Sequence, residues 1–181
     1  MEISNYGIRL RRLTADKIEL VRNWRNDSKI QQYMEYREYI SPEMQTAWFN
    51  RINNENNFYF LIIWDEKEIG LINIKDIDYS RGVCEPGIFI YEDEYLDSDV
   101  AIRAFLCLND FMWNTLKLNT AIIHVMHDNY RAIKFNEFLG YKLVEGQDGV
   151  RNKVYMLTVE DSLLNSRLNK IRDILNKQRN D

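Results

Sequence analysis

The residues from Lys117 to Tyr141 constrain the fold of this chain more than any other stretch of its sequence. They begin with a short apolar run, Thr120–Met126, which is rich in β-branched residues and too short to form a stable helix of its own. Three polar residues, 127–129, end this run, and the last of them, Asn129, is a residue type that caps helix N-termini. The pattern predicts a strand that leads through a polar turn into a helix.

The residues after this turn predict an amphipathic helix that ends at a glycine. Ala132, Phe135 and Leu139 are spaced three and four residues apart, so they fall on one face of a helix. Gly140 follows directly, at the position where a C-cap glycine ends many helices. Residues 141–145 then form an extended segment, which we predict to close the sheet together with a last strand over 153–159.

Two further patterns predict a mixed sheet. Residues 58–64 are continuously apolar and residues 69–77 form a second apolar run after a charged turn, which predicts a hairpin. The run 87–91 is followed by apolar residues at helical spacing up to Asn114, and this helix leads to the strand at 120–126. A strand, a helix and a strand in this order favour a right-handed crossover between parallel strands. The expected fold class is therefore α/β, with a central twisted mixed sheet flanked by helices.

The N-terminal part is expected to carry one strand and two helices. Residues 7–13 predict an edge strand, and Thr14 begins a helix over 15–26. Ser41 and Pro42 begin another helix, because serine caps an N-terminus and proline is tolerated at the first helical position. The side chains of this helix expected to point toward the core are Met44, Ala47, Trp48 and Ile52.

Composition and charge narrow the class of protein. A chain of 181 residues with 45% hydrophobic residues predicts one globular domain with a sizeable core. The net charge is −4 and no block is rich in lysine and arginine, so nucleic-acid binding has no support. No apolar run approaches the roughly 20 residues that a membrane helix needs. Because the N-terminus also lacks the layout of a secretory signal, we expect a cytoplasmic protein without a membrane partner.

The cysteines and histidines predict no metal site. Cys84 and Cys107 are far apart and match no metal or redox spacing, so we expect two reduced thiols. His124 and His127 have no neighbouring cysteine to complete a zinc site. His124 lies inside a predicted strand, where we expect a buried imidazole that is hydrogen-bonded to backbone.

Together these motifs resemble the GNAT superfamily of acyl-CoA-dependent N-acyltransferases, over roughly residues 7–159. The likeness centres on the helix that Asn129 opens and Gly140 closes. The resemblance implies a GNAT-like sheet, acetyl-CoA as the co-substrate and transfer of its acetyl group to a primary amine. The other segments that resemble strands and the first helix of the family are Arg9–Leu13, Val21–Asn26, Ile69–Asp78 and Glu85–Tyr91.

The resemblance also implies which residues hold acetyl-CoA. In the family, one strand receives the cofactor along its backbone, and an asparagine at the start of the later helix contacts the pantetheine arm. The pyrophosphate lies at a helix N-terminus, where backbone N–H groups bind anions. The residues implied as cofactor-binding are Ile88, Phe89, Ile90, Ser98, Asp99, Val100, Ala101, Asn129 and Arg131.

The expected pyrophosphate loop departs from the family pattern. Members usually carry a basic residue and a glycine here, and in Leu96–Ala101 only Ala101 fits. Asp97 and Asp99 stand where a pyrophosphate would lie, and their charges would repel it. Alternatively, one of the two carboxylates caps the helix and occupies the amides that a phosphate would use.

Glu85 is the expected general base. It begins the cofactor strand, at a position where related enzymes often carry an acidic residue, and the amine has to lose a proton to a carboxylate or to a water that a carboxylate holds. Asp76 and Asp78, on or after the central strand, are further candidates. A surface salt bridge is the structural alternative for Glu85.

Asn136 is the second expected catalytic residue. It aligns with a tyrosine that protonates the leaving thiolate in the family, but an amide can only hydrogen-bond the sulfur. Tyr130 and Tyr141 are the nearest phenols that could replace it. A polar position on an exposed helix face is the structural alternative.

The acceptor is expected to bind under the two N-terminal helices and their connection, residues 27–41. The aromatic residues of this region either line a pocket or are ordinary packing and surface residues. The Trp24–Asn26 and Ser41–Glu43 segments look most like enzymes that acetylate nucleotide-linked amino sugars, which is the preferred function. Ribosomal-protein or peptide N-terminal acetylation is one alternative, and a catalytically weak GNAT-fold binding or regulatory module is another. The expected acceptor-binding residues are Trp24, Arg25, Tyr33 and Asn73.

The C-terminal part extends beyond the resemblance. We expect the acetyltransferase domain to occupy residues 1–159 and a helical extension to occupy residues 160–181, with its helix over 160–180. An apolar stripe on this helix either docks on its own domain or builds a homodimer. The stripe comprises Leu163, Leu164, Leu168, Ile171, Ile174 and Leu175.

Overall fold

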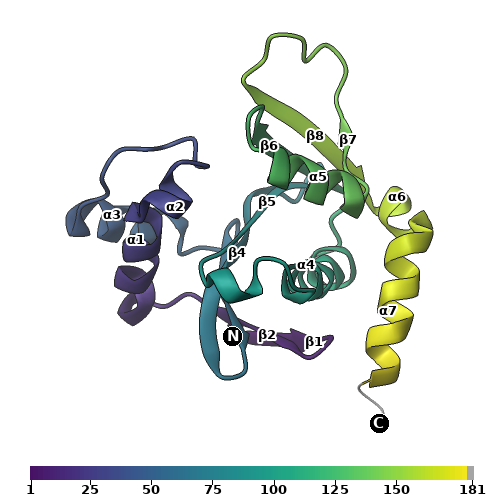
Figure 1. Ribbon diagram of the computed structural model, residues 1–181, viewed down its shortest axis with the longest axis horizontal. Helices are drawn as coiled ribbons and strands as arrows, with labels where there is room; N and C mark the ends of the chain where they lie inside the picture. The colour runs from purple at the N-terminus through teal and green to yellow at the C-terminus, as the bar shows by residue number, and fades with distance from the viewer. Residues whose placement is uncertain (179–181) are drawn as a thin grey trace.

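A computed structural model describes residues 1–178, and its centre is one eight-stranded sheet (Figure 1). The strand order is β1-β2-β3-β4-β5-β6-β8-β7. All neighbours in this order are antiparallel except β5 and β6, which are parallel. The strands are β1 (Glu2–Asn5), β2 (Ile8–Arg12), β3 (Phe58–Trp64), β4 (Lys67–Asp78), β5 (Val83–Ile90), β6 (Thr120–Met126), β7 (Lys142–Leu143) and β8 (Asn152–Thr158).

Helices lie on both sides of the sheet, with the N-terminal three on one side and the others on the opposite side (Figure 1). Short 3-10 turns precede α1 and α4, and a π-helical turn, Phe111–Thr115, continues α4. The helices are α1 (Ile18–Asn26), α2 (Ser28–Gln31), α3 (Pro42–Ile52), α4 (Val100–Asp110), α5 (Tyr130–Leu139), α6 (Val159–Leu164) and α7 (Ser166–Gln178).

The two faces of the sheet carry separate apolar clusters. The larger cluster packs the sheet against α4, α5 and α7, and it includes the fully buried Phe60, Leu106 and Leu168. The smaller cluster packs the sheet against α1 and α3, around Trp24 and Leu61. Because strand residues alternate between faces, odd-numbered residues of β5 belong to the second face and even-numbered ones to the first.

The predicted core topology is confirmed. β3 and β4 form the predicted hairpin, and β5, α4 and β6 form the parallel crossover. The helix α5 begins at Asn129, whose Oδ1 accepts from the amide of Ala132 at 3.1 Å, and it ends at Gly140 with a φ of 99°. Leu139 is 1% exposed, so the predicted apolar face does point to the core.

The strand predicted at residues 7–13 is present as β2, but the prediction that it forms the edge of the sheet is wrong. The first residues form β1, which pairs with β2 through a turn in which Tyr6 and Gly7 both have positive φ. Two residues with positive φ are typical of a tight hairpin turn. The edge of the sheet is therefore β1, and β2 lies between β1 and β3.

The predicted facing of α3 is also wrong in part. Met44 and Ala47 are exposed, whereas Ile52 is buried as predicted. Gln45 is 3% exposed instead, and its Nε2 donates to the carbonyl oxygen of Ile18 in α1 at 2.9 Å. Gln45 thus takes the inward place that the pattern predicts for Met44. Its buried carboxamide is tolerated because it has a hydrogen-bond partner, and this hydrogen bond joins α3 to α1.

The predicted single C-terminal helix is interrupted at Asn165, where the backbone is extended with a ψ of 94°. The Oδ1 of Asn165 accepts a hydrogen bond from the amide of Leu168 and so caps α7. The stripe therefore divides. Leu163 and Leu164 of α6 are 60% and 81% exposed, whereas Leu168 and Leu175 of α7 are buried in the larger cluster. Ile174 is exposed as well, and residues 179–180 of the predicted helix lie outside the described residues.

Candidate active site

The parallel strands β5 and β6 pair only at their beginning. The register contains Val83 with Thr120 and Cys84 with Ala121, and no pair beyond these. β5 continues to pair with β4 up to Ile90, so the backbone groups of 86–90 that point away from β4 have no strand partner. An open slot with free backbone donors and acceptors fits an extended amide chain such as pantetheine, and the implied cofactor residues Ile88 and Phe89 lie along it.

The start of α4 offers a second feature that fits acetyl-CoA. Asp99 precedes the helix, but its side chain does not cap it, and its carboxylate pairs instead with Arg103 at 2.8 Å. Ser98 Oγ accepts from the amide of Val100 at 3.3 Å and donates to the carbonyl oxygen of Tyr95. The expectation that an aspartate occupies the helix amides is therefore wrong, and amides of the first turn stay available to a phosphate.

Asp97 is likewise matched by a cation. Arg131 of α5 donates to its Oδ1 at 2.9 Å and to the carbonyl oxygen of Leu96. Both aspartates that would repel a pyrophosphate thus have an arginine beside them, which weakens the expected repulsion. Asp97 is fully exposed, so the pair with Arg131 is screened by solvent and can rearrange.

Asn136 is half-buried on α5, and its Nδ2 donates to the carbonyl oxygen of Ala132 at 2.8 Å. No residue in the described part of the chain donates a hydrogen bond to its carboxamide oxygen. Of the two phenols near it, Tyr130 is 69% exposed, whereas Tyr141 is buried against Phe105 and burial raises its pKa. Tyr141 is therefore a core residue and is excluded as a proton donor.

On the second face of the sheet, two polar residues and a glycine form a row level with the slot. Tyr59, Asn73 and Gly87 lie directly opposite one another on β3, β4 and β5. The Oδ1 of Asn73 lies 3.0 Å from the point where a Cβ of residue 87 would be. Glycine at this position therefore lets the carboxamide of Asn73 lie against β5, beside the slot.

Glu85 lies on the same face between two basic side chains. Its Oε1 is 3.0 Å from Nζ of Lys75 on β4 and 3.3 Å from Nδ1 of His124 on β6. The expectation of a buried His124 is wrong, because its side chain is 40% exposed on this face. The strand pattern could not reveal this, because β6 separates from β5 and leaves the face above His124 uncovered.

Arg25 of α1 reaches the same face and is partly buried. Its Nε is buried, and none of the described residues forms a hydrogen bond or ion pair with its guanidinium. Burial lowers the pKa of Arg25, and burial together with the charges of Asp76 and Glu85 raises the pKa of nearby Tyr59 to about 12. Buried polar groups in proteins are nearly always paired, so a buried Nε without a partner makes Arg25 a candidate for binding an anionic group.

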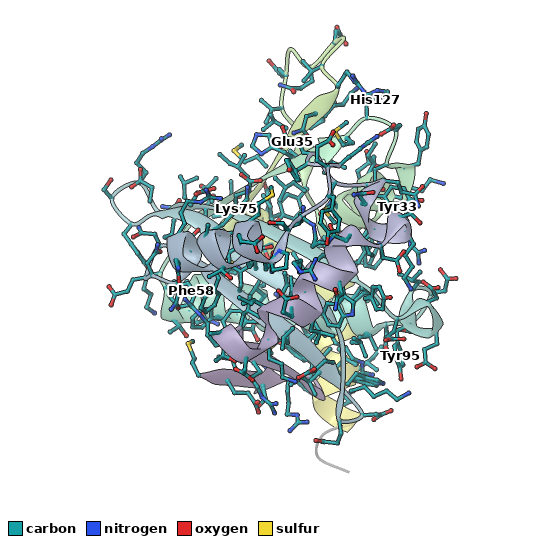
Figure 2. The ribbon with its side chains drawn as sticks, turned by 90° about the vertical axis from the view of Figure 1, so that its left-hand side faces the viewer. Tyr33, Glu35, Phe58, Lys75, Tyr95 and His127 are labelled. Atoms are coloured by element: carbon teal, nitrogen blue, oxygen red, sulfur yellow. The ribbon has the colours of Figure 1, made fainter. Side chains whose placement is uncertain are left out.

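The other predicted acceptor residues lie apart from this cluster. Trp24 is 4% exposed and stacks on Tyr91 with ring centroids 5.3 Å apart, so it packs the smaller cluster. Tyr33 is 50% exposed on the segment that links α2 to α3. Figure 2 looks onto the α1–α3 side and shows Tyr33 and Glu35 on this segment, with Lys75 on the sheet. Contact of Trp24 or Tyr33 with an acceptor stays a prediction.

No group of three or more His, Cys, Asp or Glu side chains within residues 1–178 is arranged to hold a metal ion. None of the helices in the same range has both the length and the apolar character to cross a membrane.

Comparison with known proteins decides the family. The family profile of the acetyltransferase (GNAT) domain matches residues 8–142. The chain belongs to the GNAT acetyltransferases. It is therefore an acetyl-CoA-dependent N-acetyltransferase, and the predicted fold class, enzyme class and co-substrate are confirmed.

Individual relatives of this GNAT enzyme agree with the family. Acetyltransferase PseH of Campylobacter jejuni is 28% identical over 123 residues, which are 67% of this chain and 74% of PseH. The structure of FdhC, a nucleotide-linked sugar GNAT, has a TM-score of 0.77 at 20% identity and covers 95% of this chain and 97% of FdhC. Spermidine N-acetyltransferase from Vibrio cholerae, in complex with CoA and spermine, has a TM-score of 0.73 at 19% identity, with 88% and 99% covered.

Proposed function

We propose that this enzyme moves an acetyl group from acetyl-CoA to the primary amine of a nucleotide-linked amino sugar. The observation that carries the proposal is the buried Nε of Arg25, which has no hydrogen-bond partner among the described residues and lies on the face of the sheet under α1 and α3. A nucleotide-linked sugar brings phosphate groups, and arginine binds phosphate through bidentate, charge-assisted hydrogen bonds. The amine of the same molecule would then lie near Glu85, on the same face of the sheet.

The proposed roles of the other residues follow from their places around the slot. The backbone of Ile88, Phe89 and Ile90 would hydrogen-bond the pantetheine arm and the thioester oxygen, which gains negative charge during the reaction. Asn129 would contact the same arm from the start of α5. The group proposed to lie near the pyrophosphate comprises Ser98, Asp99, Val100, Ala101 and Arg131.

The similarity to FdhC favours a nucleotide-linked sugar over other amines, since its structure covers 95% of this chain. Spermidine N-acetyltransferase has a similar fold, so polyamines are the natural comparison in an assay. We also expect a cytoplasmic location, because Cys84 and Cys107 are both free thiols. Association into a homodimer stays a prediction.

The two alternative functions have less support. The binding-module alternative rests on Asp97, Asp99 and Asn136. Both carboxylates pair with arginines and do not occupy the helix amides, which leaves Asn136 as its remaining support. Peptide N-terminal acetylation does not require a partly buried arginine on the face of the sheet under α1 and α3. No observation on this face favours a peptide over a phosphorylated acceptor.

The test is an acceptor panel in which release of the CoA thiol is measured. The panel contains a UDP-linked amino sugar with a free amine, the same sugar without the nucleotide, a peptide with a free N-terminus, and spermidine. We expect the highest kcat/KM for the nucleotide-linked sugar. Arg25→Met should lower this value by about 10- to 100-fold, as expected for loss of a hydrogen bond to a charged group, and leave the KM for acetyl-CoA unchanged.

Arg51→Met is the matched control, because Arg51 is an exposed arginine at the end of α3. It should leave every rate in the panel unchanged. A higher kcat/KM for the free sugar, the peptide or spermidine would contradict the proposal, as would equal loss of all activities in Arg25→Met.

A further inference from the structure

We propose that His124 is the general base that takes the proton from the acceptor amine, and that Glu85 and Lys75 hold its imidazole in position. This inference rests on the proposed function and deepens it by assigning the proton transfer to a named atom. It also changes the role expected of Glu85, from base to positioning residue.

The three side chains converge from three adjacent strands. Lys75 of β4 and His124 of β6 approach the same oxygen, Oε1 of Glu85 on β5, at 3.0 Å and 3.3 Å. The side chain of Glu85 is 23% exposed and that of His124 is 40% exposed. Glu85 is therefore enclosed between two basic groups, whereas the imidazole has an open side.

The contact between Glu85 and His124 lies where β5 and β6 begin to separate, which is the end of the slot nearest to both strands' paired residues. The pairing of β5 with β6 ends at Cys84 and Ala121, and Glu85 is the next residue along β5. The contact between Glu85 and His124 thus bridges the two strands where they separate, on the face that also carries Asn73 and Arg25. An amine bound on this face and a thioester bound in the slot would meet beside the ring.

The chemistry of histidine suits this role. A carboxylate beside Nδ1 keeps the ring proton on Nδ1 and leaves the lone pair on Nε2. The acceptor enters as an ammonium and gives one proton to Nε2, and the imidazolium is stabilised by Glu85. The neutral amine then forms the new C–N bond as the C–S bond breaks, and its second proton leaves with the sulfur as the thiol. Loss of the first proton from Nε2 to water restores His124.

The experiment compares His124→Ala and His124→Gln with wild type, using the amine that wild type acetylates fastest. We expect kcat to fall by about 10²- to 10⁴-fold in both variants, the range for loss of a general base, with an unchanged KM for acetyl-CoA. Added imidazole should restore part of the activity of His124→Ala, because a free base can enter the space of the missing ring. Glu85→Gln should lose less activity than His124→Ala, and imidazole should not restore it.

The pH profile gives an independent readout. In wild type, kcat/KM should fall on the acid side, because a protonated base cannot take the proton of the amine, and this acid limb should be absent in His124→Gln. The groups that face the ring are Glu85 from β5 with Lys75 behind it, while β8 places the uncharged Val154 opposite His124. The remaining pH dependence should be that of the acceptor amine itself.

The matched control is His127→Ala, since His124 and His127 are the two histidines of the chain. His127 is exposed in the turn after β6, and its substitution should leave kcat and the pH profile unchanged. Near-normal kcat in His124→Ala, or a larger loss in Glu85→Gln without rescue by imidazole, would overturn the proposal. Failure of the nucleotide-sugar proposal would appear separately, in the wild-type acceptor panel.

Discussion

The two faces of the sheet differ in the kind of side chain that they place against their helices. The face under α4, α5 and α7 is a closed apolar core, and the fully buried polar residues in it, Asn109 and Ser162, are neutral. The face under α1 and α3 has a smaller apolar cluster and, beside it, Arg25, Lys75 and Glu85. One face therefore supplies most of the hydrophobic stabilisation, and the other carries the charged groups to which we assign recognition and proton transfer.

The largest expected effect on stability is on the apolar face. Phe60 is fully buried, and its ring lies near those of Phe58 and Phe111, with centroids 6.3 Å and 5.9 Å away. Phe60→Ala should lower the free energy of unfolding by about 3–5 kcal/mol, because it removes apolar contacts and leaves a cavity. Denaturant unfolding measures this loss. Tyr36→Ala, at an exposed residue between α2 and α3, should change it by less than about 0.5 kcal/mol.

Two arginines, Arg12 and Arg25, test the comparison through changes in stability of intermediate size. Arg12 and Arg25 both have a pKa lowered by burial, but Nη2 of Arg12 donates to the carbonyl oxygens of Asn54 and Asn57. Arg12→Met should cost about 1.5–3 kcal/mol of unfolding free energy, because those hydrogen bonds to a charged group are lost. Arg25→Met should leave stability unchanged or raise it, since it removes a partly buried charge whose Nε has no hydrogen-bond partner.

The contrast between these two variants is decisive for the polar face. Thermal unfolding and acetyl transfer would be measured on both. A loss of stability in Arg25→Met as large as that in Arg12→Met would mean that the guanidinium of Arg25 has a structural role, and the division between the two faces would fail.

The smallest expected effects come from two helix caps, one on each side of the sheet. Ser41 Oγ accepts from the amide of Met44 at the start of α3, and Asn129 Oδ1 accepts from that of Ala132 at the start of α5. Each substitution by alanine should cost about 1 kcal/mol of unfolding free energy, the usual value of an N-cap. Asn129→Ala alone should also weaken acetyl-CoA binding measured by calorimetry, because α5 begins beside the slot. Equal effects of both variants on binding would contradict a contact by Asn129.

Local patterns were enough to predict much of the fold. The caps of α5, the β3–β4 hairpin and the parallel crossover were all correctly predicted, because each depends on neighbouring residues or on residues one helical turn apart. The prediction of α3 shows the limit of such patterns. Its apolar pattern placed Met44 inward, whereas the structure exposes Met44 and buries Gln45, which donates a hydrogen bond to α1.

The sequence alone determined the central elements, from the β3–β4 hairpin to α5, and the family resemblance, because periodicity, capping residues and turn residues act over a few positions of the chain. Only the tertiary structure decided the chemistry of the site. The contacts of Glu85 with Lys75 and His124 join strands that are 10 and 39 residues apart along the chain, as their numbers show. The pairing of Asp97 with Arg131 is equally remote. Such contacts depend on strand register and on where β5 and β6 separate, and these are set by packing of the whole sheet rather than by any local pattern.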